Sequence, residues 1–217
     1  MKNIKIFQGF TEHMHKNLIL YMITLLFLCI GIVIGIYTVK YMGDVEKGEL
    51  VNYLINYSKS IDPNSLNKKY VFLQAAKNNI SIILIIWFLG LTMLGTPFIL
   101  VADLIKGFTI GFTSGLVING LGTKGILLNL LVVFPQNIIY IPCIIISSVF
   151  AMEFSLMLLR SNPINPVAKG NNLFQVATYS TLFLFVVGFM FIGFILEGYL
   201  TPNIIKLLLH NLGSTLS

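Results

Sequence analysis

The sequence predicts an all-α, polytopic integral membrane protein: a helix bundle with about five spans plus a broken or re-entrant half-helix at 125–135. Two observations predict this class. Of the 217 residues, 56% are apolar and only 10% are charged. Several apolar runs also exceed the roughly 18 residues that mark a membrane-spanning helix. We therefore treat residues 1–217 as a single membrane domain.

The net charge of +6 comes from basic residues that are scattered between the apolar runs. This distribution is typical of residues that face lipid headgroups, so the predicted partner is the lipid bilayer and not nucleic acid. Cys29 and Cys143 lie inside apolar runs. A thiol in such a place behaves as a small hydrophobic group, and we expect no structural disulfide.

The first span is expected at about 17–39, after a short basic tail. Gly31 and Gly35 within this span form a GxxxG pair, which lets another helix approach closely. The polar segment 40–78 follows and is too small for an independent catalytic domain. We expect it to form a helical hairpin on the membrane or a docking surface for a partner.

The second span is expected at about 79–101 and the third at about 107–121. Pro97 predicts a kink near the end of the second span, because proline removes a backbone donor and clashes with the preceding turn. Asp103 and Lys106 mark a tight connection between the two spans.

Three glycines open the third span at positions i, i+4 and i+8, namely Gly107, Gly111 and Gly115. This double GxxxG pattern exposes one smooth stripe of helix backbone. We expect the third span in the middle of the bundle. The same stripes also make a homo-oligomer plausible.

The stretch 125–159 is unusual because "LLVVFPQNIIYIPCIIISS" places two prolines inside an apolar run. One straight helix of that length would measure roughly 50 Å, against a hydrocarbon core of about 30 Å. We predict a half-helix broken at Pro135, followed by a full span. Gln136 and Asn137 are expected to bond the backbone groups that Pro135 and Pro142 leave unpaired.

The last span is expected at about 174–200. With an odd number of spans, the density of Lys and Arg favours a cytoplasmic N-terminus and an extracytoplasmic C-terminus. This orientation places the loop 40–78 on the extracytoplasmic side of the cell membrane.

The sequence gives little support for catalysis. Glu12, His13 and His15 form the only cluster of His and carboxylate, and the two histidines lack the i, i+4 spacing of a zinc site on a helix. We predict a solvated tail there, with no metal and no cofactor. No HExxH, GxSxG or GxxxxGK[ST] motif occurs, so we predict that the protein is not an enzyme.

Three carboxylates lie in or beside the predicted spans, where an ionisable group is costly and is a functional hypothesis by default. We expect Asp103 and Glu197 at the level of the lipid headgroups, where they cost little, and keep Asp103 beside Glu153 as a possible intramembrane polar residue. For Glu153 the alternatives are an internal polar partner and an interfacial carboxylate.

Four segments carry a resemblance to a known family: "NN" before the second span, "KGFTIGFTSG", "NGLG" and above all "PQNIIYIP". With these segments the chain resembles the stage II sporulation protein M family of endospore-forming bacteria. The wider family often has His-Gly after the first proline and Glu before the second. Here Gln136, Asn137 and Tyr140 stand at those places, which removes the ionisable groups from the motif.

The resemblance implies a non-catalytic scaffold in the mother-cell or septal membrane during sporulation. Such a scaffold would recruit and organise two peptidoglycan hydrolases, sporulation proteins D and P, for septal wall degradation and forespore engulfment. The residues leave open an alternative: a small oligomeric permease or channel with a broken-helix site around Pro135–Pro142.

Overall fold

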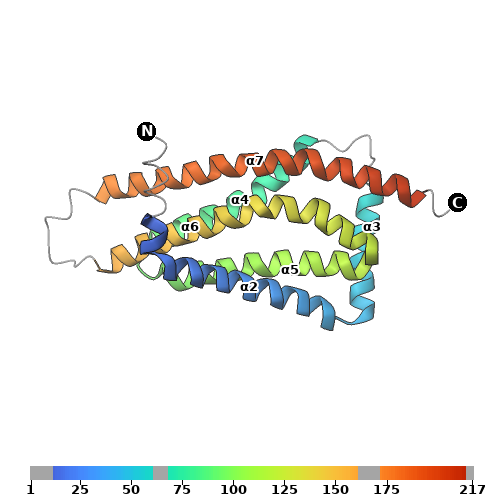
Figure 1. Cartoon of the computed structure of the whole chain (residues 1–217), viewed down its shortest axis with the longest axis horizontal. Helices are drawn as coiled ribbons and strands as arrows, with labels where there is room; N and C mark the ends of the chain where they lie inside the picture. Colours follow the sequence, from blue (N-terminus) through green and yellow to red (C-terminus); the bar gives the residue numbers. More distant parts are fainter. Residues whose placement is uncertain (1–11, 61–67, 161–171, 214–217) are drawn as a thin grey trace.

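The computed structural model of the chain is a bundle of long helices that lie side by side, and it describes residues 12–60, 68–160 and 172–213 (Figure 1). No strand occurs among these residues. Five helical stretches are long and apolar enough to cross a membrane: Leu18–Tyr41, Val71–Gly90, Gly95–Gly120, Gly125–Arg160 and Phe174–Tyr199. The predicted all-α membrane bundle is thus confirmed.

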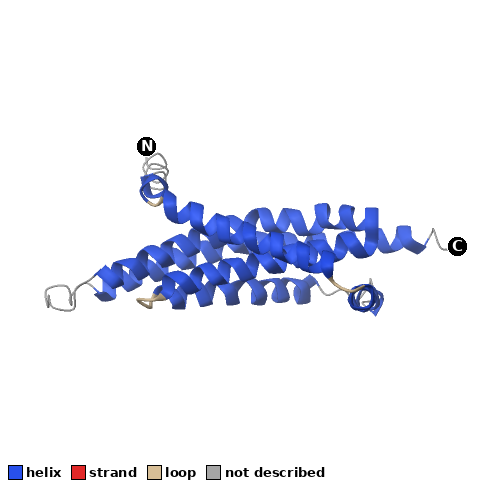
Figure 2. Ribbon diagram, turned by 90° about the horizontal axis from the view of Figure 1, so that it is seen from below, coloured by secondary structure: helices blue, strands red, loops and turns tan. Residues whose placement is uncertain are grey.

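The elements follow one another as α2 (Leu18–Tyr41), α3 (Asp44–Ser60), α4 (Lys68–Gly90), α5 (Gly95–Leu128), η1 (Asn129–Val133), α6 (Phe134–Arg160) and α7 (Asn172–Gly213). Helix α2 begins at one end of the bundle, and α7 ends at the other (Figure 1). Helix α3 lies across that second end and is seen end-on in Figure 2. It packs on α5, where Val51 covers Gly120.

The tightest packing joins α2 and α5 through glycine. A Cβ atom added at any of four positions would overlap backbone atoms of the facing helix, and these positions are Gly31, Gly35, Gly107 and Gly111. At Gly115 an added Cβ would make only ordinary contact with Val39, at 3.4 Å. The two glycine stripes therefore face each other within one chain. They are occupied there, so the argument for a homo-oligomer loses its main support.

The connection between the second and third spans lies at 91–94, so the prediction of a connection at Asp103 and Lys106 is wrong. The backbone N–H of Thr92 donates to the Leu89 carbonyl, and that of Gly95 donates to the Thr92 carbonyl. Helix α5 then begins, with Pro97 in its first turn. Proline is tolerated at such a place because the first N–H groups of a helix have no partner within it. Pro97 opens a helix and does not kink one.

The predicted break at Pro135 is also wrong. The chain changes direction at Gly122, whose φ of 58° and ψ of −131° interrupt the helical conformation. An L side chain rarely adopts such a φ, and glycine does so at little cost. From Gly125 to Arg160 the chain then forms one continuous candidate span.

A π-helical turn, η1, explains why this span continues through Pro135. The N–H of Phe134 bonds to the Asn129 carbonyl, five residues earlier. The following proline therefore lies next to a widened turn, where the ring has more room than in a regular α-helix. Pro142 also lies inside α6 without ending it.

The main core fills the space between α4, α5, α6 and α7. Its fully buried members include Ile86, Ile99, Ile144, Met152 and Phe194. The outer faces of α2 and α7 expose large apolar side chains instead. Such faces fit a protein whose surroundings are lipid, since no water-soluble protein of this size would expose so much apolar surface.

Candidate functional site

Polar side chains from four helices meet inside the bundle. Asn79 comes from α4, Lys106 from α5, Tyr140 from α6 and Glu197 from α7. The Lys106 ammonium Nζ donates to Asn79 Oδ1 at 2.8 Å, and the Tyr140 hydroxyl donates to Glu197 Oε2 at 2.8 Å. Lys106 and Glu197 make no direct ion pair, and only a longer-range attraction between opposite charges links the two hydrogen-bonded pairs. We call these four residues the interior polar cluster.

Asn79 and Tyr140 are the best-buried members of the interior polar cluster, with 5% and 2% of their surface exposed. The Asn79 amide uses its other end as well, since Nδ2 donates to the Ala75 carbonyl at 3.0 Å. The Tyr140 ring fits because residue 193 is glycine, where any Cβ would overlap that ring. Gly193 lies one turn before Glu197 on α7. The same face of α7 therefore leaves space for the Tyr140 ring and accepts the hydrogen bond of its hydroxyl.

Asp103 lies one turn before Lys106 on α5 and is fully buried. Its Oδ1 accepts a 2.7 Å hydrogen bond from the Ser148 hydroxyl of α6, and its Oδ2 is buried without a protein partner. The favoured headgroup position for Asp103 is therefore wrong, and the alternative of an intramembrane polar residue fits its burial within the third candidate span. The cause is the connection at 91–94, which places Asp103 in the third turn of α5.

Glu197 lies two residues before the end of the last candidate span, so its headgroup position stays a prediction, but its carboxylate is partly buried and accepts a hydrogen bond from Tyr140. Sequence reasoning missed Asn79, Lys106 and Tyr140 as intramembrane polar partners. The sequence indicates a connection at Lys106, and it marks Asn79 and Tyr140 only as positions in the segments that carry the resemblance, with no polar partner expected for either. The available signal was the cost of an ionisable group in a span, which applies to lysine as much as to carboxylates.

The proline motif contributes less to polar chemistry than the sequence predicts. Asn137 does bond the backbone, through Nδ2 to the Val133 carbonyl at 2.7 Å. The carbonyls that lose an α-helical donor to the two prolines belong to Leu131 and Ile138, so Asn137 does not repair them. Gln136 has a buried Oε1 with no protein partner.

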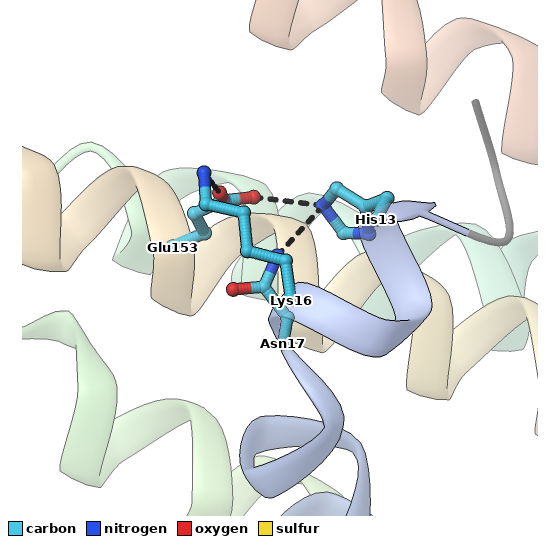
Figure 3. Close-up of polar contacts among 4 residues, drawn as sticks. All are labelled: His13, Lys16, Asn17 and Glu153. Carbon is cyan, nitrogen blue, oxygen red and sulfur yellow. Dashed lines mark hydrogen bonds and ion pairs between the residues drawn. The ribbon is translucent and has the colours of Figure 1, made fainter.

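A second polar site lies at the end of the bundle where α2 begins (Figure 3). Glu153 of α6 is bonded there by His13 Nε2 at 2.8 Å and by Lys16 Nζ at 3.4 Å. The Asn17 amide lies 3.1 Å from the same His13 nitrogen. Glu153 thus has a polar partner from another segment, while its place at the end of the bundle and its 33% exposed side chain fit the interfacial alternative as well.

His13 is not part of a solvated tail, so that prediction is wrong for this residue. Its ring lies 4.5 Å from the ring of Phe150, and the Nδ1 atom is buried without a protein partner. Glu12 and His15 are exposed, as predicted. The contact joins residues 140 positions apart, and no local pattern in the sequence indicates it.

The described residues offer few means of catalysis. None of their groups of His, Cys, Asp and Glu has three members placed to hold a metal ion. Cys143 is buried, and the exposed Cys29 lies on an apolar face of α2. The polar side chains of the interior instead join helices to one another.

Comparison with known proteins identifies the family. The family model for stage II sporulation protein M matches residues 24–202, which include the interior polar cluster, the glycine stripes and the proline motif. Neither a curated protein nor a solved structure matches the chain. Because the match extends over most of the sequence, the chain belongs to the stage II sporulation protein M family and is a multi-pass, sporulation-related membrane protein.

Proposed function

We propose that this protein is a non-catalytic membrane scaffold that recruits and organises two peptidoglycan hydrolases, sporulation proteins D and P. Their action degrades the septal wall and allows the mother-cell membrane to engulf the forespore. The family match over residues 24–202 is the observation that carries this proposal. The polar interior supports it, because its hydrogen bonds join α4, α5, α6 and α7 into one rigid body.

Helix α3 is the surface that we propose for contact with the hydrolases. Gly48 and Val51 lie on its half-buried side, and its exposed side chains include Val45, Glu46 and Glu49. This helix lies across the end of the bundle (Figure 2). A helix in that position meets the ectodomain and the membrane anchor of a partner at the same time.

Co-purification in mild detergent from sporulating cells tests the proposal, with an affinity tag on the N-terminus. We expect both hydrolases to be recovered with the wild-type protein. Glu49→Lys on α3 should reduce that recovery, while the matched charge reversal Glu12→Lys at the opposite end should not. Recovery of the protein without either hydrolase would overturn the scaffold.

We propose a cytoplasmic N-terminus and an extracytoplasmic C-terminus, which places α3 outside the cell membrane. The opposite ends of the bundle at which α2 begins and α7 ends support an odd number of crossings (Figure 1). The density of Lys and Arg supports this orientation less strongly than the sequence indicates, because Lys106 lies inside the bundle. Labelling with a membrane-impermeant maleimide decides the orientation: Glu49→Cys should react in intact cells and Glu12→Cys should not, each in a background without Cys29 and Cys143.

A permease or channel is the second candidate, and the interior polar cluster is the observation that favours it. Intramembrane ionisable groups mark ion pathways in many transporters. Its site would lie at Lys106 and Glu197, since the chain is not broken around Pro135–Pro142. Flux in reconstituted vesicles that is lost with Lys106→Met, combined with co-purification of no hydrolase, would favour this reading over the scaffold.

A further inference from the structure

A large groove opens at the end of the bundle where α2 begins. Its volume is about 1000 Å³, at the upper end of the roughly 300–1,000 Å³ range of small-molecule sites. The first turn of α2, the last three turns of α6 and the first turns of α7 form its walls. Apolar side chains dominate these walls, among them Leu20, Phe150, Phe154, Met157 and Leu182.

The groove changes from apolar to polar along its length. Three candidate spans begin or end at its mouth, at Leu18, Arg160 and Phe174. Because span ends lie near the lipid headgroups, the mouth lies at headgroup level and the apolar walls extend toward the hydrocarbon. A phospholipid has the same order of polarity along its length.

The mouth of the groove carries more positive than negative charge. Lys16 and Arg160 line it together with one carboxylate, Glu153. His13 and Lys16 both bond that carboxylate, at 2.8 Å and 3.4 Å, and the Lys16 side chain is still 76% exposed. Arg160 forms no ion pair with any residue that the structure describes. Two cations thus face the mouth, and at least one of them has no protein anion nearby.

We propose that this groove binds one anionic phospholipid, with its phosphate between Lys16 and Arg160 and an acyl chain along Phe154 and Leu182. Basic sites between membrane helices bind anionic headgroups, because a guanidinium or ammonium forms charge-assisted hydrogen bonds to phosphate oxygens. The bound lipid lies between α2 and α7 and packs against α6. The proposal is independent of whether the protein recruits hydrolases.

The test uses the purified full chain in detergent, titrated with phosphatidylglycerol or with phosphatidylcholine. Phosphatidylglycerol should raise the thermal unfolding midpoint and remain bound in native mass spectrometry, and phosphatidylcholine should do neither. The double variant Lys16→Gln/Arg160→Gln should bind phosphatidylglycerol about tenfold more weakly or worse, because it loses two charge-assisted bonds. The control variant Lys40→Gln, with its charge at the other end of the bundle, should bind as the wild type does.

A second pair of variants tests the acyl-chain part of the groove. Thr178→Trp fills the groove from an exposed position of α7, whereas Leu184→Trp places the same side chain on the outer face of that helix. We expect only Thr178→Trp to lose the bound lipid. Equal binding of both lipids, full binding by the Lys16/Arg160 variant, or equal protection by soluble glycerol phosphate would overturn the proposal. The groove could instead hold a membrane helix of a co-purifying partner. Loss of such a partner with Thr178→Trp, together with no preference between the two lipids, would also overturn the proposal.

Discussion

Gly111 of α5 lies directly against the backbone of Ile32 in α2. A Cβ atom at position 111 would overlap the Ile32 carbonyl oxygen, and Gly107 stands in the same relation to Leu28. From the other side, Gly35 presses on the backbone of α5 in the same way. Packing of this kind holds α2 to the bundle mainly by van der Waals contact between backbones, since burial from lipid supplies little driving force.

Gly111→Leu should therefore prevent normal packing of α2. The side chain cannot enter the backbone contact without separating the helices, which should cost about 3 kcal/mol or more. Thermal unfolding in detergent micelles and the yield of folded protein measure the loss. Gly188→Leu is the matched control, because a Cβ at that position of α7 meets nothing within 4 Å. Equal stability of the two variants would show that the α2–α5 contact is not close in the folded protein.

The turn at Gly122 should tolerate substitution worse than the proline at 135. Gly122→Ala forces a side chain into a left-handed φ of 58° and should lower the free energy of unfolding by about 1–3 kcal/mol. Pro135→Ala should change it by less than about 1 kcal/mol, because the π-helical turn already accommodates the ring. Denaturant titration of both variants measures the difference. A larger effect at Pro135 would restore the break that the sequence predicts there.

The class of fold follows from the sequence because composition and run length are local properties. The glycine stripe of α5 can also be read from the sequence, since i, i+4 spacing alone places Gly107 and Gly111 on one face. The position of the break cannot be read from the sequence in this way, because both proline and glycine can interrupt a helix and the letters "NGLG" do not show that Gly122 has a φ of 58°. The interior polar cluster is hidden for another reason. Tyr140 and Glu197 stand 57 residues apart, and only the register of α6 on α7 brings them together.

Tyr140→Phe should destabilise the α6–α7 contact. The substitution keeps the ring and removes only the hydroxyl, so it leaves the Glu197 carboxylate without its donor in a partly buried place. Loss of one partner of a buried hydrogen bond costs about 1–3 kcal/mol. The midpoint of thermal unfolding in micelles gives the effect. Tyr37→Phe supplies the control, because Tyr37 is 49% exposed on α2 and stacks on Tyr41 through its ring. Equal midpoints for the two variants would show that Glu197 does not depend on Tyr140.

Lys106 and Glu197 should behave as an energetically coupled pair. Lys106→Met removes a cation and leaves the Asn79 amide oxygen without its donor, whereas Glu197→Gln leaves the cation of Lys106 uncompensated. The double variant should lose less stability than the sum of the single variants, by about 0.5–3 kcal/mol. A double-mutant cycle by denaturant titration measures this coupling. Strict additivity would mean that the two charges are screened from each other, and would weaken the case for a charge pathway through the bundle.

His13 should hold the segment before α2 against α6 without adding much to global stability. Its partner Glu153 has 33% of its side chain exposed, and an exposed ion pair contributes only about 0–1 kcal/mol. His13→Ala should therefore speed hydrogen exchange of the backbone amides around 13–20 while the unfolding midpoint stays nearly constant. His15→Ala, at an exposed neighbour on the same turn, should leave that exchange unchanged. If both variants exchange alike, the Glu153 contact does not restrain this segment, and the mouth of the groove beside it is free to widen.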